Sequence, residues 1–176
     1  VSLQIWKPIK TTYVNSKQDK KLIIMSAPSG AGKTSIVKHL LEQDLKLQFS
    51  ISVTSRPKRP NEVDKKDYYF YTVEEFKAKL AADEFLEWQE VYPGRCYGTL
   101  LSVVRKMQDE GKHVVFDVDV VGGTNIKKFF GEKALSVFVQ PPSVEELRRR
   151  LEGRGTDSSQ MIEKRLAKAE QELAYA

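Results

Sequence analysis

The sequence predicts an α/β fold in which helices pack on a parallel sheet, and three observations support this prediction. Three short apolar runs at residues 22–25, 113–118 and 135–139 are typical of buried parallel strands. Segments with helical periodicity separate these runs along the chain. A glycine-rich loop, SAPSGAGKTS at residues 26–35, joins the first run to the first helical segment. Strands and helices that alternate in this way form a parallel sheet, because each parallel connection needs a crossover.

The composition is that of a single globular domain. The chain has 176 residues, of which 40% are hydrophobic and 30% charged, enough to bury a core without disulfides. Cys96 is the single cysteine, which suits a reducing compartment, so we expect a cytoplasmic protein. No apolar run approaches the ~18 residues of a membrane span. The net charge of +5 suits an anionic partner without distinguishing a nucleic acid from a nucleotide.

The helices are predicted from periodicity and from their end signals. Residues 1–20 show no clear periodicity and are interpreted as an N-terminal extension. Residues 34–43 and 100–110 have helical patterns, and Gly111 suits the position just after the second helix. The tetrapeptide SVEE at 143–146 is a capping box that opens a helix through Leu151, and a last helix spans about 157–175.

Residues 50–100 have a different pattern. The segment SISVTS alternates, YYFYTV is aromatic and β-branched, and TVEE at 72–75 is a capping box. This block predicts a small insert of short strands and one helix beside the main sheet.

The glycine-rich loop predicts a phosphate site. Residues 27–34 read APSGAGKT and depart from the pattern G-x-x-x-x-G-K-[ST] only at Ala27. Gly30 and Gly32 permit a turn that points successive N–H groups inward, and the following helix adds its positive end. Lys33 would reach the β- and γ-phosphates, and the Thr34 hydroxyl would ligate Mg²⁺. The alternative is an ordinary glycine-rich turn, but the strand before and the helix after favour a nucleoside triphosphate.

A second phosphate site is indicated by arginines and tyrosines in the insert. Arg56 and Arg59 lie three residues apart among prolines and could hold one phosphate bidentately, although a solvated basic loop is the general alternative. Tyr68 and Tyr97 could donate to the same phosphate, or simply pack. Glu87 could accept two N–H bonds from a guanine edge. On spacing alone, however, Glu87 is better explained as an exposed strand residue.

Two acids lie at the carboxyl end of the strand predicted at residues 113–118. Asp117 and Asp119 are two residues apart, so their carboxylates should face the same side at the carboxyl end of the sheet. There they would overlook the glycine-rich loop, in position for Mg²⁺ or its waters. The alternative is a turn at the end of the strand.

Arginines near the C-terminus suggest a movable lid. Arg150 and Arg154 lie four residues apart, with Gly153 as a hinge, and Arg165 follows eleven residues later. Guanidinium groups that close over the loop could stabilise charge on a transferring phosphoryl group. A solvated helix face is the alternative, and we retain it for Arg148 and Arg149.

Five segments together resemble guanylate kinase. They are SAPSGAGKT, SVTSRPKRPNE with DYYF, FLEWQEVYPGRCYGT, FDVDVVGG and PPSVEELRRRLEGRGTDSSQMIEKRLAKAEQELAYA. They occur in the family's order over about residues 20–176. The resemblance implies a three-layer α/β/α P-loop kinase that converts ATP and GMP (or dGMP) into ADP and GDP with Mg²⁺. It implies one domain over residues 21–176. The core would be 21–51, 101–141 and 166–176, the GMP-binding region 52–100, and the lid 142–165.

The resemblance also implies a role for each matching residue. The guanine would be bound by Ser52, Glu87 and Thr99, with Asp117 near the base, and the GMP phosphate by Arg56, Arg59, Tyr68 and Tyr97. The ATP-binding loop would be Ser29, Gly30, Ala31, Gly32, Lys33, Thr34 and Ser35. The groups engaged in phosphoryl transfer would be Lys33, Arg56, Arg150, Arg154, Arg165 and Asp119. The metal would be held by Thr34 and, through water, by Asp119.

Three alternative functions are weighed against this one. A non-catalytic guanylate-kinase-like binding module is expected to lose loop features, whereas Lys33, Thr34 and Asp119 are present. A kinase for another nucleoside monophosphate is disfavoured because Glu87 would repel the acceptor N1 of adenine. A nucleic-acid binder is suggested only by the net charge, and no partner protein or membrane is indicated. Family members usually continue through one more strand and helix, so we expect the natural chain to extend past Ala176.

Overall fold

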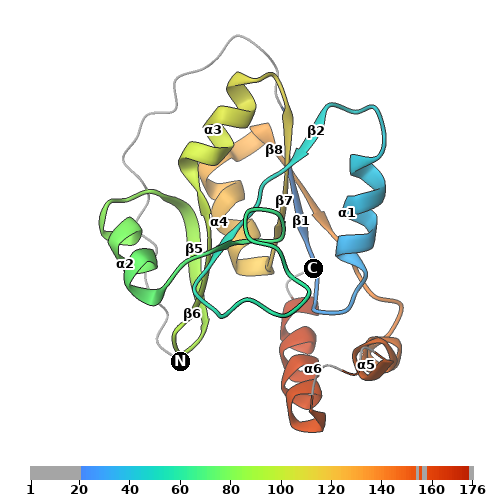
Figure 1. Cartoon of the computed structure of the whole chain (residues 1–176). Coiled ribbons are helices and arrows are strands. Elements are labelled where there is room, and N and C mark those ends of the chain that lie inside the picture. The colour runs from blue at the N-terminus through green and yellow to red at the C-terminus, as the bar shows by residue number, and fades with distance from the viewer. Residues whose placement is uncertain (1–20, 154, 156–157, 175–176) are drawn as a thin grey trace.

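The main sheet has four parallel strands in the order β2-β7-β1-β8 (Figure 1). The computed structural model describes residues 21–153, 155 and 158–174, so the predicted N-terminal extension lies outside the described residues. All three apolar runs form strands, which confirms the predicted α/β class. The strands are β1 (Leu22–Ser26), β2 (Leu47–Phe49), β7 (His113–Val118) and β8 (Ala134–Phe138).

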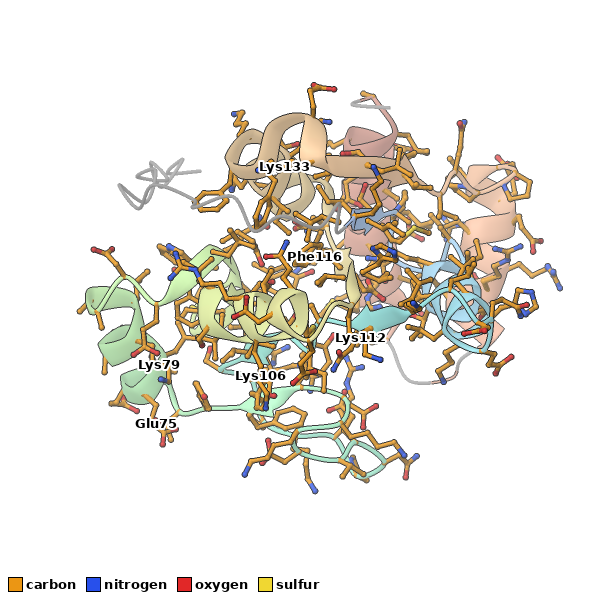
Figure 2. All side chains as sticks on the ribbon, turned by 90° about the horizontal axis from the view of Figure 1, so that it is seen from above. Glu75, Lys79, Lys106, Lys112, Phe116 and Lys133 are labelled. Atoms are coloured by element: carbon orange, nitrogen blue, oxygen red, sulfur yellow. The ribbon has the colours of Figure 1, made fainter. Side chains whose placement is uncertain are left out.

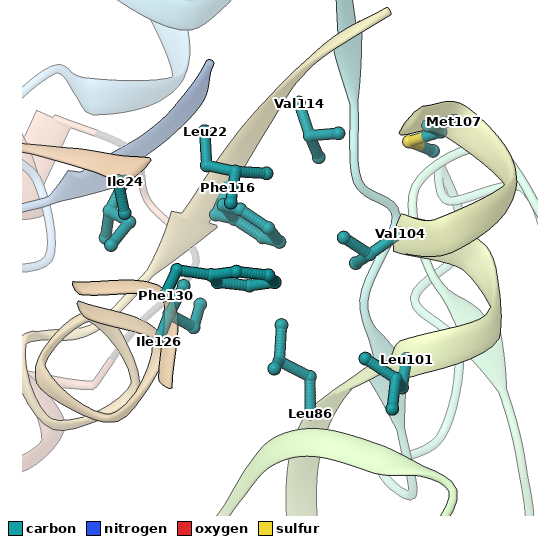
Figure 3. Close-up of a cluster of buried hydrophobic side chains, with 11 residues drawn as sticks. Leu22, Ile24, Leu86, Leu101, Val104, Met107, Val114, Phe116, Ile126 and Phe130 are labelled. Atoms are coloured by element: carbon teal, nitrogen blue, oxygen red, sulfur yellow. The ribbon is translucent and has the colours of Figure 1, made fainter. Parts of the chain in front are cut away.

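Helices cover both faces of this sheet because alternate side chains of each strand point to opposite faces. On one face, Met25 and Val115 pack against Val37 of α1 (Lys33–Leu41). On the other face, Ile24 and Phe116 pack against α3 (Leu101–Asp109) and α4 (Val120–Phe130), as Figure 3 shows. The arrangement is the expected three-layer α/β/α sandwich. Gly111, with a φ of 77°, follows α3 as predicted.

The sequence patterns did not predict α4, which contains two consecutive glycines. Glycine lowers helix propensity, so the segment lacks a strong local signal. Close packing explains both residues. A Cβ at Gly122 would lie 2.9 Å from Oε2 of Glu87, and a Cβ at Gly123 would lie 3.1 Å from Cγ2 of Ile24. The helix therefore approaches β1 and the insert more closely than side chains would allow. A short 3₁₀ turn, η1 (Gly131–Lys133), connects α4 to β8.

The predicted insert is a second, mixed sheet in the order β4-β3-β6-β5. Its longest strands, β5 and β6, pair antiparallel, whereas β3 and β4 pair parallel. The predicted capping box is present, because Thr72 and Glu75 exchange hydrogen bonds at the start of the helix. Figure 2 shows Glu75 and Lys79 of this helix at the periphery of the molecule and Phe116 in its interior. The elements are β3 (Val53–Thr54), β4 (Tyr69–Phe70), α2 (Val73–Ala81), β5 (Phe85–Tyr92) and β6 (Arg95–Leu100).

The last two helices, α5 (Val144–Gly153) and α6 (Ser159–Leu173), share an apolar cluster of their own. Of the capping box predicted for α5, the Ser143 half is present, since the Glu146 N–H donates to Ser143 Oγ at 3.1 Å, whereas the Glu146 carboxylate accepts from Arg149 and Arg150. The α5 leucines also rest on the glycine-rich loop, where a Cβ at Gly30 would lie 3.0 Å from Leu147 Cδ1. Within the described residues, no helix is long and apolar enough to cross a membrane.

Burial in the sheet predicts which apolar residues carry stability. Phe116 is 1% exposed, so Phe116→Ala should lower the free energy of unfolding by about 3–5 kcal/mol. Leu45, between α1 and β2, is 49% exposed, and Leu45→Ala should cost less than about 1 kcal/mol. Urea denaturation followed by circular dichroism measures both values. Similar losses for the two variants would contradict this account of the core.

Candidate functional site

A cleft of about 470 Å³ lies where the carboxyl ends of β1 and β7 face the insert and α6. Segments predicted separately converge here. Most of the residues singled out in the sequence line it, namely Ser29, Gly30, Ala31, Gly32, Lys33, Thr34, Ser35, Ser52, Arg56, Arg59, Tyr68, Glu87, Tyr97, Asp117, Asp119 and Arg165. Thr99 and Arg150 are not among the lining residues, and Arg154 is outside the described residues.

The glycine-rich loop has the backbone geometry of an anion nest. Gly30 and Gly32 have φ values of 98° and 99°, a region that L-residues with a Cβ rarely adopt. Gly32 is the N-cap of α1, and no side chain among the described residues caps this helix, so its first N–H groups are open to an anion. Ala27, where the pattern has glycine, is buried without a positive φ, so its methyl group is compatible with the loop.

Lys33 crosses from α1 to the end of β7. Its Nζ donates to the Val118 carbonyl at 2.7 Å and forms an ion pair with Asp117. Asp117, expected near a base, is therefore paired with the loop lysine in this state. The contact ties the loop to the neighbouring strand and holds the ammonium group at the floor of the cleft.

Asp119 lies just past β7, which ends at Val118 as predicted. It caps α4, because the Gly122 N–H donates to Asp119 Oδ1 at 2.9 Å. Lys168 Nζ lies 3.4 Å from the other carboxylate oxygen. The described residues contain no group of three or more His, Cys, Asp or Glu that could hold a metal ion. The Asp119 carboxylate and the Thr34 hydroxyl are nevertheless the hard oxygen donors that Mg²⁺ prefers when phosphates and water supply its other ligands.

Glu87 is buried at 5% exposure, so the expectation of an exposed strand residue from its spacing is wrong. It pairs with Thr99 across β5 and β6, and the Thr99 hydroxyl donates to Glu87 Oε1 at 2.7 Å. Burial raises the pKa of Glu87 to about 7, although the Thr99 hydrogen bond acts in the opposite direction. Thr99 thus holds this carboxylate in place.

Arg56 is 7% exposed, which excludes a solvated basic loop for this residue. Its guanidinium lies 5.0 Å from the ring centroid of Tyr68, and its Nε donates to the Tyr97 hydroxyl at 3.1 Å. Nη1 and Nη2 donate to the two carboxylate oxygens of Glu62 at 2.7 and 2.5 Å. Arg59 lines the same part of the cleft and is exposed. Arg56, Tyr68 and Tyr97 of the predicted group are therefore in mutual contact, whereas Arg59 shares the lining of the cleft with them.

Two of the predicted lid arginines contact the loop directly. Arg165 Nη1 donates to Ser29 Oγ at 3.0 Å, inside the cleft. Arg150 Nη1 donates to the Ala31 carbonyl at 3.1 Å, while its Nε donates to Glu146 at 2.8 Å. Arg148 and Arg149 are exposed and pair with acids of α5 and α6, as the solvated alternative predicted.

The lining also includes Gln89, Lys168 and Glu172, which were not predicted from the sequence. Gln89 lies two residues after Glu87 on β5, so strand alternation could have placed it on the same face. Lys168 and Glu172 follow Arg165 at helical spacing on α6, and their charged groups are 3.5 Å apart. Glu62 was also missed, because no local pattern connects it to Arg56.

Comparison with known proteins supports one family. Residues 19–176 match the sequence pattern of the guanylate kinase family. The guanylate kinase of Bacteroides fragilis is 58% identical over 167 residues, covering 95% of this chain and 82% of the relative. That of Bacteroides thetaiotaomicron is 59% identical over 156 residues, covering 89% and 76%. The crystal structure of guanylate kinase from Anaplasma phagocytophilum superposes with a TM-score of 0.70 at 31% identity, covering 88% of this chain and 71% of that one.

The pKa of Glu87 predicts how stability depends on pH. Its ordinary value is 4.5 and its value in the folded protein is about 7, so the folded state keeps the proton to higher pH. Stability therefore falls as pH rises from about 4.5 to about 7. Glu87→Gln removes this titration. Between pH 5 and pH 8 the wild type should therefore lose about 2 kcal/mol of unfolding free energy that the variant keeps.

Urea denaturation at both pH values measures this difference. The exposed Glu74 of α2 offers a matched control, and Glu74→Gln should follow the wild-type pH dependence. A Glu87→Gln variant with the same pH dependence as wild type would show that the buried carboxyl does not titrate as described.

Proposed function

The chain belongs to the guanylate kinase family, and we propose that the cleft between the glycine-rich loop and Glu87 is where it transfers the γ-phosphoryl group of ATP to GMP. The observation that carries this proposal is the juxtaposition of two different sites in one cleft. One is an open anion nest, and the other is a buried carboxylate with an arginine and tyrosine group beside it. A nucleotide at each site would bring the two phosphate ends toward each other.

Glu87 is proposed to bind the guanine base. An ionised carboxylate can accept the N1–H and N2–H₂ donors of guanine together, whereas adenine presents an acceptor at N1. Thr99 orients the carboxylate, and Gly122 leaves room beside Oε2. Ser52 and Asp117 also line this part of the cleft, in keeping with the base contacts proposed for them. Selectivity for guanine would then follow from burying an acceptor that adenine cannot satisfy.

Arg56, Arg59, Tyr68 and Tyr97 are proposed to hold the GMP phosphate. Arg56 is already fixed by its contacts, so little side-chain entropy is lost when an anion binds. Charge-assisted hydrogen bonds from guanidinium groups to phosphate are among the stronger ones in proteins. This group would fix the acceptor oxygen in line with the incoming phosphorus.

The loop of residues 29–35 is proposed to bind the ATP phosphates. Its N–H groups and the start of α1 would contact them, Lys33 would exchange Asp117 for phosphate oxygens, and Arg165 would add charge from α6. Arg150 and Arg154 complete the proposed lid group. No covalent intermediate is needed, since alignment and charge neutralisation suffice for phosphoryl transfer.

Mg²⁺ is proposed to bind with ATP, held by the Thr34 hydroxyl and through water by Asp119. When bound it would neutralise phosphate charge. Closure of the insert (residues 52–100) and the lid (residues 142–165) would exclude water, which otherwise competes as acceptor.

Replacing Lys33 tests the donor site. Lys33→Ala should lower kcat for GMP-dependent ADP release by about 100-fold or more, because the variant loses a positive charge beside the transferring group. The fold should remain intact by circular dichroism. Lys38 is exposed on the same helix, and Lys38→Ala should retain wild-type turnover in the coupled assay. Unchanged turnover in Lys33→Ala would remove Lys33 from the proposed mechanism.

Replacing Glu87 tests the acceptor site. The protonated carboxyl cannot accept both guanine donors, so with a pKa of about 7 it should make GMP binding about tenfold weaker at pH 6 than at pH 8. Glu87→Gln should bind GMP more weakly and should lose the part of the pH dependence that comes from Glu87. The titration of the GMP phosphate affects both proteins equally and therefore cancels in the comparison. Calorimetry with GMP, AMP and ATP at both pH values measures the effect. An equal loss of ATP affinity would contradict the assignment of Glu87 to the base.

A further inference from the structure

Arg56 presents two usable hydrogen-bonding edges, and the protein occupies only one of them fully. A guanidinium is planar, with one edge formed by Nη1 and Nη2 and another formed by Nε and Nη2. The first edge is occupied by the carboxylate of Glu62, which accepts from Nη1 at 2.7 Å and from Nη2 at 2.5 Å. The remaining Nη1 hydrogen is directed to the Pro57 carbonyl at 3.0 Å.

The second edge is the one beside Tyr97. Nε donates to the Tyr97 hydroxyl oxygen at 3.1 Å, which leaves the phenolic hydrogen available to another acceptor. The second hydrogen of Nη2 has no acceptor among the described residues. Arg56 and Tyr97 both line the cleft, whereas Glu62 lies outside its lining. The edge at Tyr97 is therefore the one that an anion in the cleft can reach.

Glu62 is held independently of Arg56. The Arg59 N–H donates to Glu62 Oε2 at 2.8 Å, and the Glu62 N–H donates back to the Arg59 carbonyl at 3.1 Å. The hydrogen bonds from Arg56, and secondarily the one from the Arg59 backbone, lower the pKa of Glu62 to about 2. The carboxylate is thus a fixed anion that links the Arg56 side chain to the Arg59 main chain.

We propose that Glu62 is a positioning residue for the acceptor phosphate: it occupies the rear edge of Arg56 and thereby turns the Nε–Nη2 edge toward that phosphate. The inference rests on the proposed placement of the GMP phosphate at Arg56. Because Glu62 is anchored behind the cleft, the phosphate binds at the second edge and Glu62 stays in place. Without this carboxylate, the Arg56 guanidinium could adopt several orientations and would no longer be aligned with Tyr97.

Three ligands and two substitutions test the proposal. Glu62→Gln replaces one acceptor oxygen by an NH₂ group that faces an Nη donor, so it breaks the bidentate contact at nearly constant size. It should weaken GMP binding by about tenfold or more, because a misplaced phosphate anchor loses its hydrogen bonds. Guanosine, which lacks the phosphate, should bind with unchanged affinity, and so should ATP. Glu74→Gln removes a negative charge from the same region without touching Arg56 and should leave all three affinities unchanged.

A double-mutant cycle identifies the partner through which Glu62 acts. Arg56→Met should weaken GMP binding, and adding Glu62→Gln to it should cause no further loss if Glu62 acts only through Arg56. An Arg56→Met variant with wild-type GMP affinity would instead refute the proposed placement of the phosphate. If Arg56→Met weakens GMP but Glu62→Gln leaves it unchanged or tighter, the phosphate site stands and the role of Glu62 is refuted. An equal loss of guanosine affinity in Glu62→Gln would also refute it, since general loosening of the insert would then explain the result.

Discussion

The parallel pairing of β1 with β7 is the constraint on which the site depends. It places Met25 opposite Asp117 and Ser26 opposite Val118, so the glycine-rich loop begins beside the segment that carries both acids. The loop then returns toward β7, because Lys33 of α1 bonds the carbonyl of Val118. A one-residue slip would exchange the β1 side chains that face α1 with those that face α3 and α4, and would separate the loop from these partners. The sheet register and the cleft are therefore specified by the same apolar residues.

Many charged groups of the cleft already have a partner within the protein. Lys33 is paired with Asp117, Arg56 with Glu62, and Lys168 with Asp119. Burying a charge is costly unless it is paired, so these contacts allow polar groups to line an interior site. They also mean that nucleotide binding exchanges one set of ionic contacts for another. The affinity for a nucleotide therefore depends on the difference in free energy between the contacts within the free protein and the contacts with the ligand. A residue that only positions a cationic side chain can then affect affinity as much as one that contacts the ligand.

Local patterns predicted the parts of the fold that local chemistry determines. The loop was recognisable because its glycines permit the turn and Lys33 begins the helix. The capping box at Thr72 and the Ser143 cap are likewise short-range contacts. The helix α4 was missed because its glycines are required by packing against Glu87 and Ile24, which only the tertiary structure brings near.

Glu87 itself was misjudged from its spacing for a related reason. Its burial arises from Thr99 on the partner strand and from α4, not from its neighbours in sequence. The resemblance to a known family assigned it a role where periodicity could not. Gln89 and Lys168, by contrast, could have been predicted from the sequence. Gln89 lies two residues after Glu87 on a strand, and Lys168 lies three residues after Arg165 on a helix, so each shares a face with a residue that was recognised. Glu62 has no such signal, because its contact with Arg56 spans a turn of irregular backbone.

The helix α6 connects the glycine-rich loop to the segment that follows β7. From one face it extends Arg165 to Ser29 of the loop and Lys168 to Asp119 at the end of β7. Its apolar side packs with α5 in a cluster separate from the main core, and α5 in turn rests on Gly30. In the proposed lid closure, this helix pair, which has its own small core, would move relative to the sheet as a unit. Contacts of α6 with both the loop and Asp119 would then make its position sensitive to any anion or cation bound between them.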